Sequence, residues 1–184
     1  MANTDTSNTV RQDAIAYLAK FKNKKYLPMF TKTLGDSSYK CVSAALSAIN
    51  KIDTNLSQTN AILFLAEPDM ELKNVCYTVL SERYDSSLCS LFEAKLNEEA
   101  GYTKIGLFYH YANYLTHADS ALVVRGMNYL YTKGAEDISK KYNTHAQSSI
   151  KRICDYIKKR SDAPFYASVK KLADDLLDKL KTLE

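Results

Sequence analysis

Apolar residues recur at helical spacing along almost the whole chain. In the last segment, apolar side chains from Phe165 to Leu183 share one face, and charged residues such as Lys170 and Asp174 share the other. This periodicity predicts an amphipathic helix, and a one-sided helix at a chain end is typical of the cap of a helical stack. Similar stripes run through residues 10–21, 39–49, 72–80 and 150–157.

The residues that start and stop helices divide these stripes into about ten or eleven helices. The 184 residues include only 5 Gly and 3 Pro, far fewer than the many turns of a β-sandwich or barrel require. The pattern therefore predicts an all-α fold in which short connections join antiparallel neighbours.

Several short motifs repeat within the chain. An Asp-x4-Val-Arg motif occurs at residues 5–11 and again at residues 119–125, and Asp36 and Asp69 continue the series from Asp5 at intervals of 31 and 33 residues. An Asp ahead of a helix caps its first turn, and we expect the Val of each pair to lie in the seam and the Arg in solvent. A period near this length predicts stacked pairs of helices, an α-solenoid.

The sequence Val10-Arg11-x2-Ala14-x3-Leu18 resembles a degenerate HEAT-type repeat, and the likeness covers most of the chain. The Ala-rich, Tyr-rich and Gly-poor texture is also similar to the C-terminal helical domain of bacterial zinc aminopeptidases of the aminopeptidase N type. This resemblance implies a HEAT-like stack that walls the active-site cavity and restricts the access of peptides. It also implies that zinc belongs only to the parent catalytic domain, with no cofactor in this chain.

The two ends of the chain resemble those of an excised fragment. Residues 1–184 are expected to form a single helical-repeat domain from the C-terminal part of a longer protein, with Leu183-Glu184 as a remnant of a tag junction. The partner would then be the catalytic domain of the same polypeptide, or a protein or peptide.

The three histidines are the first candidates for a catalytic or metal site. The zinc motif His-Glu-x-x-His is absent, which predicts no metal and no catalytic residue in this chain. His110, Asn113 and His117 fall at i, i+3 and i+7, so on a helix they share one polar strip beside an aromatic stripe. A metal would need a further acidic or thiolate ligand, so we interpret the strip as a candidate contact surface.

Three Ser-x-x-Lys sequences begin at Ser37, Ser148 and Ser168. In serine acyl-transferases this spacing brings a lysine to a nucleophilic hydroxyl, but the companion motifs Ser-Asp-Asn and Lys-Thr-Gly are absent. We expect these hydroxyls to cap helices or to face solvent. The four cysteines are widely spaced, which favours buried free thiols over a zinc knuckle.

The net charge of +4 is unevenly distributed, because residues 53–103 hold 3 Lys/Arg against 9 Asp/Glu. The lysines of residues 20–25 and the basic residues of 151–160 are therefore expected to form solvated faces, and no nucleic-acid partner is predicted. No stretch approaches the ~18 apolar residues of a membrane span, and residues 1–9 do not resemble a signal peptide. These features predict no membrane partner and favour the cytoplasm.

Two other functions remain open. A free-standing HEAT-like adaptor would expose apolar or aromatic residues on one face and bind a protein there. A helical-repeat protein that reads damaged DNA would bind through a basic groove, with affinity that falls steeply with added salt.

Overall fold

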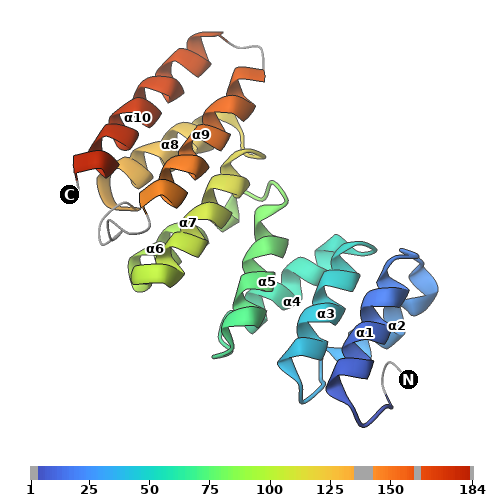
Figure 1. The fold of residues 1–184 in the computed structure, drawn as a ribbon. Coiled ribbons are helices and arrows are strands. Elements are labelled where there is room, and N and C mark those ends of the chain that lie inside the picture. Colours follow the sequence, from blue (N-terminus) through green and yellow to red (C-terminus); the bar gives the residue numbers. More distant parts are fainter. Residues whose placement is uncertain (1–3, 135–142, 160–162, 183–184) are drawn as a thin grey trace. The chain divides into compact units, whose positions relative to one another are not determined.

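The computed structural model describes residues 4–134, 143–159 and 163–182, and the regular structure in these residues is helical throughout (Figure 1). The described part contains ten α-helices, a 3-10 turn and a short π-helix. The prediction of an all-α fold with about ten helices is therefore confirmed.

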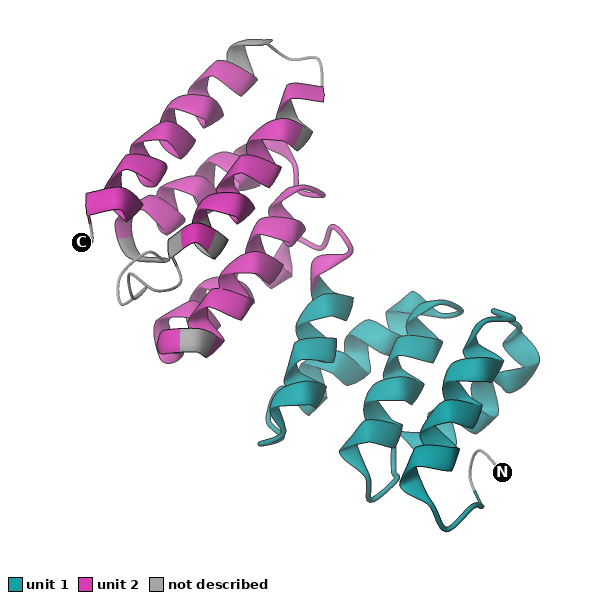
Figure 2. Ribbon diagram, viewed as in Figure 1, with its two compact units in different colours: residues 1–80 teal, residues 81–184 magenta. Residues whose placement is uncertain are grey.

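The chain divides into two compact units, residues 1–80 and residues 81–184 (Figure 2). Unit 1 comprises α1 (Asn8–Ala19), η1 (Lys24–Tyr26), α2 (Leu27–Thr33), α3 (Tyr39–Asn50), α4 (Thr54–Phe64) and α5 (Met70–Ser81), which ends one residue beyond the boundary. Unit 2 comprises α6 (Ser87–Glu98), α7 (Gly101–Leu115), α8 (Ser120–Tyr129), η2 (Leu130–Gly134), α9 (Asn143–Lys159) and α10 (Ala163–Thr182). The single repeat domain over residues 1–184 stays a prediction.

The core of unit 1 forms around α3, which packs against α1, α2 and α4. Because α3 has neighbours on several sides, most of its side chains are buried rather than one stripe alone. The buried core residues come from α1, α2 and α3: Ile15, Ala19, Phe30, Cys41, Ala45, Ala48 and Ile49.

Aspartates begin several helices, as the sequence pattern predicts. Asp53, Asp69 and Asp119 each accept a hydrogen bond from the backbone N–H three residues later, at 3.0, 2.8 and 2.9 Å. Each bond satisfies one of the N–H groups that the first turn of a helix leaves without a partner. Asp5 and Asp36 differ, because each accepts from the N–H two residues later, at 2.8 Å, and so forms a turn just before its helix.

The two Asp-x4-Val-Arg motifs therefore occupy different helical registers. Ser7 is the N-cap of α1, whereas Asp119 itself is the N-cap of α8. The two motifs are alike in sequence, but their aspartates do not occupy the same position relative to the helix that follows.

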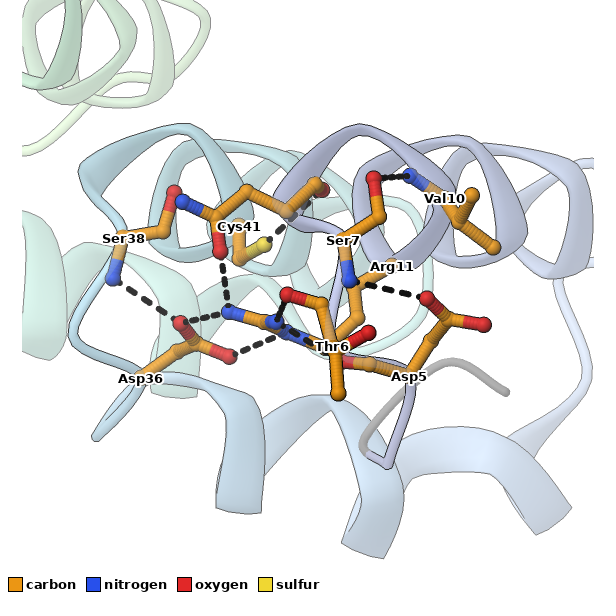
Figure 3. A network of polar contacts seen from close by, with 9 residues as sticks. Asp5, Thr6, Ser7, Val10, Arg11, Asp36, Ser38 and Cys41 are labelled. Atoms are coloured by element: carbon orange, nitrogen blue, oxygen red, sulfur yellow. Dashed lines mark hydrogen bonds and ion pairs between the residues drawn. The ribbon is translucent and has the colours of Figure 1, made fainter.

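Arg11 lies at the centre of a polar network that joins α1 to the turn before α3 (Figure 3). Its guanidinium donates to both oxygens of Asp36, at 3.0 and 2.8 Å, and to the carbonyl of Asp5 at 2.8 Å. The hydrogen bonds from Arg11 lower the pKa of the Asp36 carboxyl below its ordinary value. Arginine suits this position because its planar fork matches a carboxylate.

The exposure of Val10 and the burial of Arg11 are the reverse of what the sequence predicts. Val10 is 38% exposed, whereas Arg11 is only 9% exposed. The prediction that Val10 lies in the seam and Arg11 in solvent is therefore wrong. The reason is that a charged side chain can be buried when its donors are satisfied, and Arg11 has both a carboxylate and backbone carbonyls within reach.

Unit 2 is built around α7, which packs against α6, α8 and α9, while α10 covers α8, α9 and η2. The predicted stripe of the last helix is confirmed in α10, where Val169, Ala173, Leu176 and Leu180 are fully buried. The side chain of Phe165 and residue Leu183 lie outside the described residues.

A glycine on α8 permits close packing against α7. A Cβ at Gly126 would lie 2.5 and 2.7 Å from the two δ-carbons of Leu115 and 2.9 Å from the Tyr111 hydroxyl. We expect Gly126→Ala to lower the free energy of unfolding of unit 2 by about 1 kcal/mol, because the overpacking exceeds the gain in helix propensity. Chemical denaturation measures the change.

The matched control is Gly106→Ala, because a Cβ at this glycine of α7 would meet no atom within 4 Å. This substitution should raise the free energy of unfolding by about 0.5–1 kcal/mol. Equal effects of the two substitutions would contradict the packing described here.

Candidate functional site

An open groove of about 530 Å³ lies in unit 2 between α7 and α9. One side of the groove comes from the last turn of α7 and the two residues that follow this helix. The other side comes from a single face of α9, where the lining positions follow helical spacing. The lining residues are Asn113 from α7, Thr116 and His117 directly after it, and Ser148, Lys151, Arg152, Asp155 and Lys159 from α9.

Three cations and one carboxylate line the groove, which gives it a net positive charge. Lys151, Arg152 and Lys159 supply the cations and Asp155 supplies the carboxylate. Burial lowers the pKa of His117, and the nearby charge of Arg152 lowers it further, while Glu82 acts in the opposite direction. His117 is therefore neutral at neutral pH and can both donate and accept a hydrogen bond.

The Arg152 side chain is held in place by residues of α7. Its guanidinium donates to Asn113 Oδ1 at 2.7 Å and to the Tyr109 hydroxyl, and it lies 5.3 Å from the centre of the Tyr109 ring. Asn113 is positioned in turn, because its Nδ2 donates to the Ser81 carbonyl at 3.0 Å. A guanidinium fixed by two such contacts loses little entropy on binding an anion, and its other N–H groups can reach a carboxylate.

The Ser148 and Thr116 hydroxyls in the groove each donate a hydrogen bond to a backbone carbonyl. Ser148 donates to the carbonyl of Thr144 at 2.9 Å, and Thr116 donates to the carbonyl of Asn113 at 2.7 Å. Ser148 does not cap α9, but it is exposed to solvent, which is one of the two roles that we expected for the Ser-x-x-Lys sequences, and it lines the groove beside Lys151. This arrangement favours the binding of anions over acyl transfer.

The structure separates the three residues of the predicted contact strip. Asn113 and His117 both line the groove, whereas His110 is buried, and burial lowers its pKa to about 4. Helical spacing alone did not predict that Asn113 and His117 lie beside the α9 residues. The spacing of Ser148, Lys151, Arg152 and Asp155 places them on one helical face, but it does not show that this face lies beside α7.

A second polar cluster in unit 2 is structural. Glu93 accepts hydrogen bonds from the buried Tyr111 hydroxyl at 3.0 Å and from Arg125 at 2.6 Å, and Cys89 Sγ lies 3.4 Å from the same hydroxyl. Burial raises the pKa of Tyr111 far above its ordinary value, so the hydroxyl stays protonated and donates. These contacts link α6, α7 and α8.

All four cysteines are free, as predicted. Cys41, Cys76 and Cys89 are buried, and Cys154 is half-buried. Burial raises the pKa of Cys76 to about 12 and that of Cys154 to about 11. Both thiols are therefore protonated and weakly nucleophilic at neutral pH.

Comparisons with protein-family models, curated proteins and solved structures found no match. Among the residues that the structure describes, no group of three or more His, Cys, Asp or Glu side chains could hold a metal ion. Across residues 4–134, 143–159 and 163–182, none of the helices has both the length and the apolar character needed to cross a membrane.

Proposed function

We propose that this chain is the non-catalytic, helical-repeat C-terminal domain of a zinc-dependent enzyme of the aminopeptidase N kind. In this proposal its helices stack as a HEAT-like α-solenoid that walls the active-site cavity and restricts the access of peptides. Zinc and the catalytic residues would belong to the preceding part of the same polypeptide. The resemblance in sequence and the packing of successive amphipathic helices, such as α9 on α10, support this proposal.

The observation that carries the proposal is the cationic groove between α7 and α9. A wall that selects among peptides needs a surface with a definite chemical preference, and this groove has three cations, one of which is the fixed guanidinium of Arg152. Carboxylates complement such a surface. Peptides with acidic tails are therefore the ones that the groove would retain.

We expect the double variant Lys151→Glu, Arg152→Glu to weaken the binding of hexaglutamate by about tenfold or more, because two of the three cations of the groove are reversed in sign. Isothermal titration calorimetry of the chain with hexaglutamate measures the change. Added salt should weaken the binding of the unmodified chain as well, since the groove is open to solvent.

The matched control is the double variant Lys158→Glu, Lys171→Glu, which alters net charge equally. Both of its lysines are exposed, and neither lines the groove. Equal weakening in the control would show that net charge, and not the groove, attracts the peptide.

The size of the native polypeptide tests the proposed parent enzyme. An antibody raised against this chain should detect, in a lysate of the source cells, a band several times larger than 20.8 kDa. The corresponding protein should hydrolyse aminoacyl substrates, and a chelator should abolish that activity. A band of the size of the chain alone would reject the parent enzyme.

A free-standing adaptor is the alternative, and exposed apolar side chains in unit 1 favour it. Leu63 is 66% exposed, and Ile62 and Met70 are also well exposed, at the end of α4 and the start of α5. Such residues are typical of surfaces that bind another protein. The adaptor becomes the leading proposal if the native polypeptide is no longer than this chain.

A further inference from the structure

Two aromatic rings project from the surface at the end of α1. Tyr17 is 58% exposed and Phe21 is 56% exposed, and their rings lie edge to face with centroids 5.4 Å apart. The ring centroid of Tyr26 lies 6.4 Å from that of Phe21 and 6.3 Å from that of the buried Phe30. The rings thus form a continuous series from the core of unit 1 to its surface, so the exposed pair is anchored rather than loose.

Several lysines are close to the exposed rings along the chain. Lys20, Lys22, Lys24 and Lys25 are all exposed, and every charged residue between positions 14 and 35 is a lysine. The ammonium group of Lys20 lies 5.9 Å from the centre of the Tyr17 ring. We refer to Tyr17, Lys20, Phe21, Lys22, Lys24 and Lys25 as the aromatic–lysine patch. The nearest acidic residue along α1 is Asp13, one turn before Tyr17.

A tight turn brings the patch together. Lys22 has a φ of 48°, in the left-handed region that a residue with a Cβ rarely adopts. After it, the Asn23 side chain accepts a hydrogen bond from the N–H of Lys25 at 3.0 Å and starts η1. The chain therefore turns within a few residues of Phe21, and the Lys25 ammonium lies 4.8 Å from the centre of the Tyr26 ring.

We propose that the aromatic–lysine patch binds the surface of an anionic phospholipid bilayer. Exposed Tyr and Phe rings partition into the region of the lipid headgroups, and lysines are attracted to the negative surface potential of anionic lipids. A protein bound in this way lies on the membrane surface and needs no membrane-spanning helix. This inference is independent of the proposed function, and it revises the expectation of a merely solvated lysine face without a membrane partner.

The geometry favours a bilayer over single-stranded nucleic acid. Proteins bind single strands by stacking successive bases on aromatic faces, but the rings of Tyr17 and Phe21 are inclined at 79°, so neighbouring parallel bases cannot stack on both. All the cations of the patch are lysines, which act as point charges. Arginine differs, because its planar fork donates two parallel hydrogen bonds to one phosphate.

The test is the sedimentation of the full chain with vesicles of phosphatidylcholine, with and without phosphatidylserine. We expect binding only to the vesicles that contain phosphatidylserine, and weaker binding at high salt. Each lysine near an anionic surface strengthens binding about fivefold, so Lys20, Lys22, Lys24 and Lys25 replaced together by Gln should weaken it by several hundredfold, on the order of 600-fold.

The matched control replaces four exposed lysines of unit 2, Lys158, Lys170, Lys171 and Lys181, by Gln. The control should retain much stronger binding than the patch variant, and equal losses would overturn the proposal. Absence of binding to the anionic vesicles would also overturn it, as would preferential binding of a single-stranded oligonucleotide or of an acidic peptide at the patch.

The chain has no Trp, so Phe21→Trp introduces a single reporter. Its fluorescence should shift to the blue when anionic vesicles are added, because the indole leaves water for the interface. An unchanged spectrum for the bound protein would overturn insertion of the ring, and with it the proposal.

Discussion

Replacing Phe92 by alanine is expected to lower the free energy of unfolding of unit 2 by about 3–5 kcal/mol. Phe92 is 1% exposed, and its ring centroid lies 5.6 Å from that of Tyr111 and 5.4 Å from that of Tyr114. Hydrogen bonds hold both tyrosines, to Glu93 and to the Asp85 carbonyl at 2.9 Å. They cannot move freely into the space left by the ring, so a cavity remains. Chemical denaturation followed by circular dichroism measures the loss.

The control for this prediction is Phe21→Ala, because the Phe21 ring is more than half exposed. Truncating an exposed phenylalanine should change the free energy of unfolding by no more than about 0.5 kcal/mol. A loss below 1 kcal/mol for Phe92→Ala would contradict a rigid aromatic core between α6 and α7.

Unit 2 is also expected to lose stability on the order of 3 kcal/mol as the pH falls from 7 to 4. Burial lowers the pKa of His110 to about 4 from 6.5. Between these values the unfolded chain binds a proton that the folded chain excludes, so acid favours unfolding. The contribution begins to fall near pH 6.5 and has been lost at about pH 4. Urea denaturation at a series of pH values measures this slope.

His110→Gln should flatten this pH dependence, because the amide does not titrate. His117→Gln should have a smaller effect, since His117 lies at the surface, although burial lowers its pKa as well. An unchanged slope in His110→Gln would show that another group controls the acid sensitivity of unit 2.

Unit 1 should respond to acid in a different range. The pKa of Asp36 lies below its ordinary value of 3.8, chiefly because of the hydrogen bonds from Arg11. A carboxyl of this kind stabilises the fold at higher pH and loses its contribution as the pH falls through its own, lowered pKa. The two units can therefore be distinguished by where their acid transitions begin.

Much of the secondary structure could be predicted because its causes are local. Helical periodicity and a scarcity of Gly and Pro depend only on neighbours along the chain. The aspartate caps follow the same logic, since Asp69 and Asp119 bond to N–H groups three residues away. The exposure of Val10 and the burial of Arg11 could not be predicted, because Arg11 is satisfied by Asp36, 25 residues further along.

The candidate site also combines features that have local causes with features that depend on residues distant in the sequence. The strip of His110, Asn113 and His117 follows from the helical repeat, but the burial of His110 depends on the elements packed around α7. The groove itself exists only because α9 packs against α7 and places Arg152 within reach of Asn113. No spacing within either helix contains that information.

The sequence by itself determined that this protein is all-helical, roughly how many helices it has, and where several of them begin. The tertiary structure alone decided which charges are buried, which aromatic rings are left exposed at the end of α1, and which cations line the groove of unit 2. The physical reason is that helix formation is governed by interactions over a few residues, whereas burial, ion pairing and grooves require segments that are distant in sequence to meet.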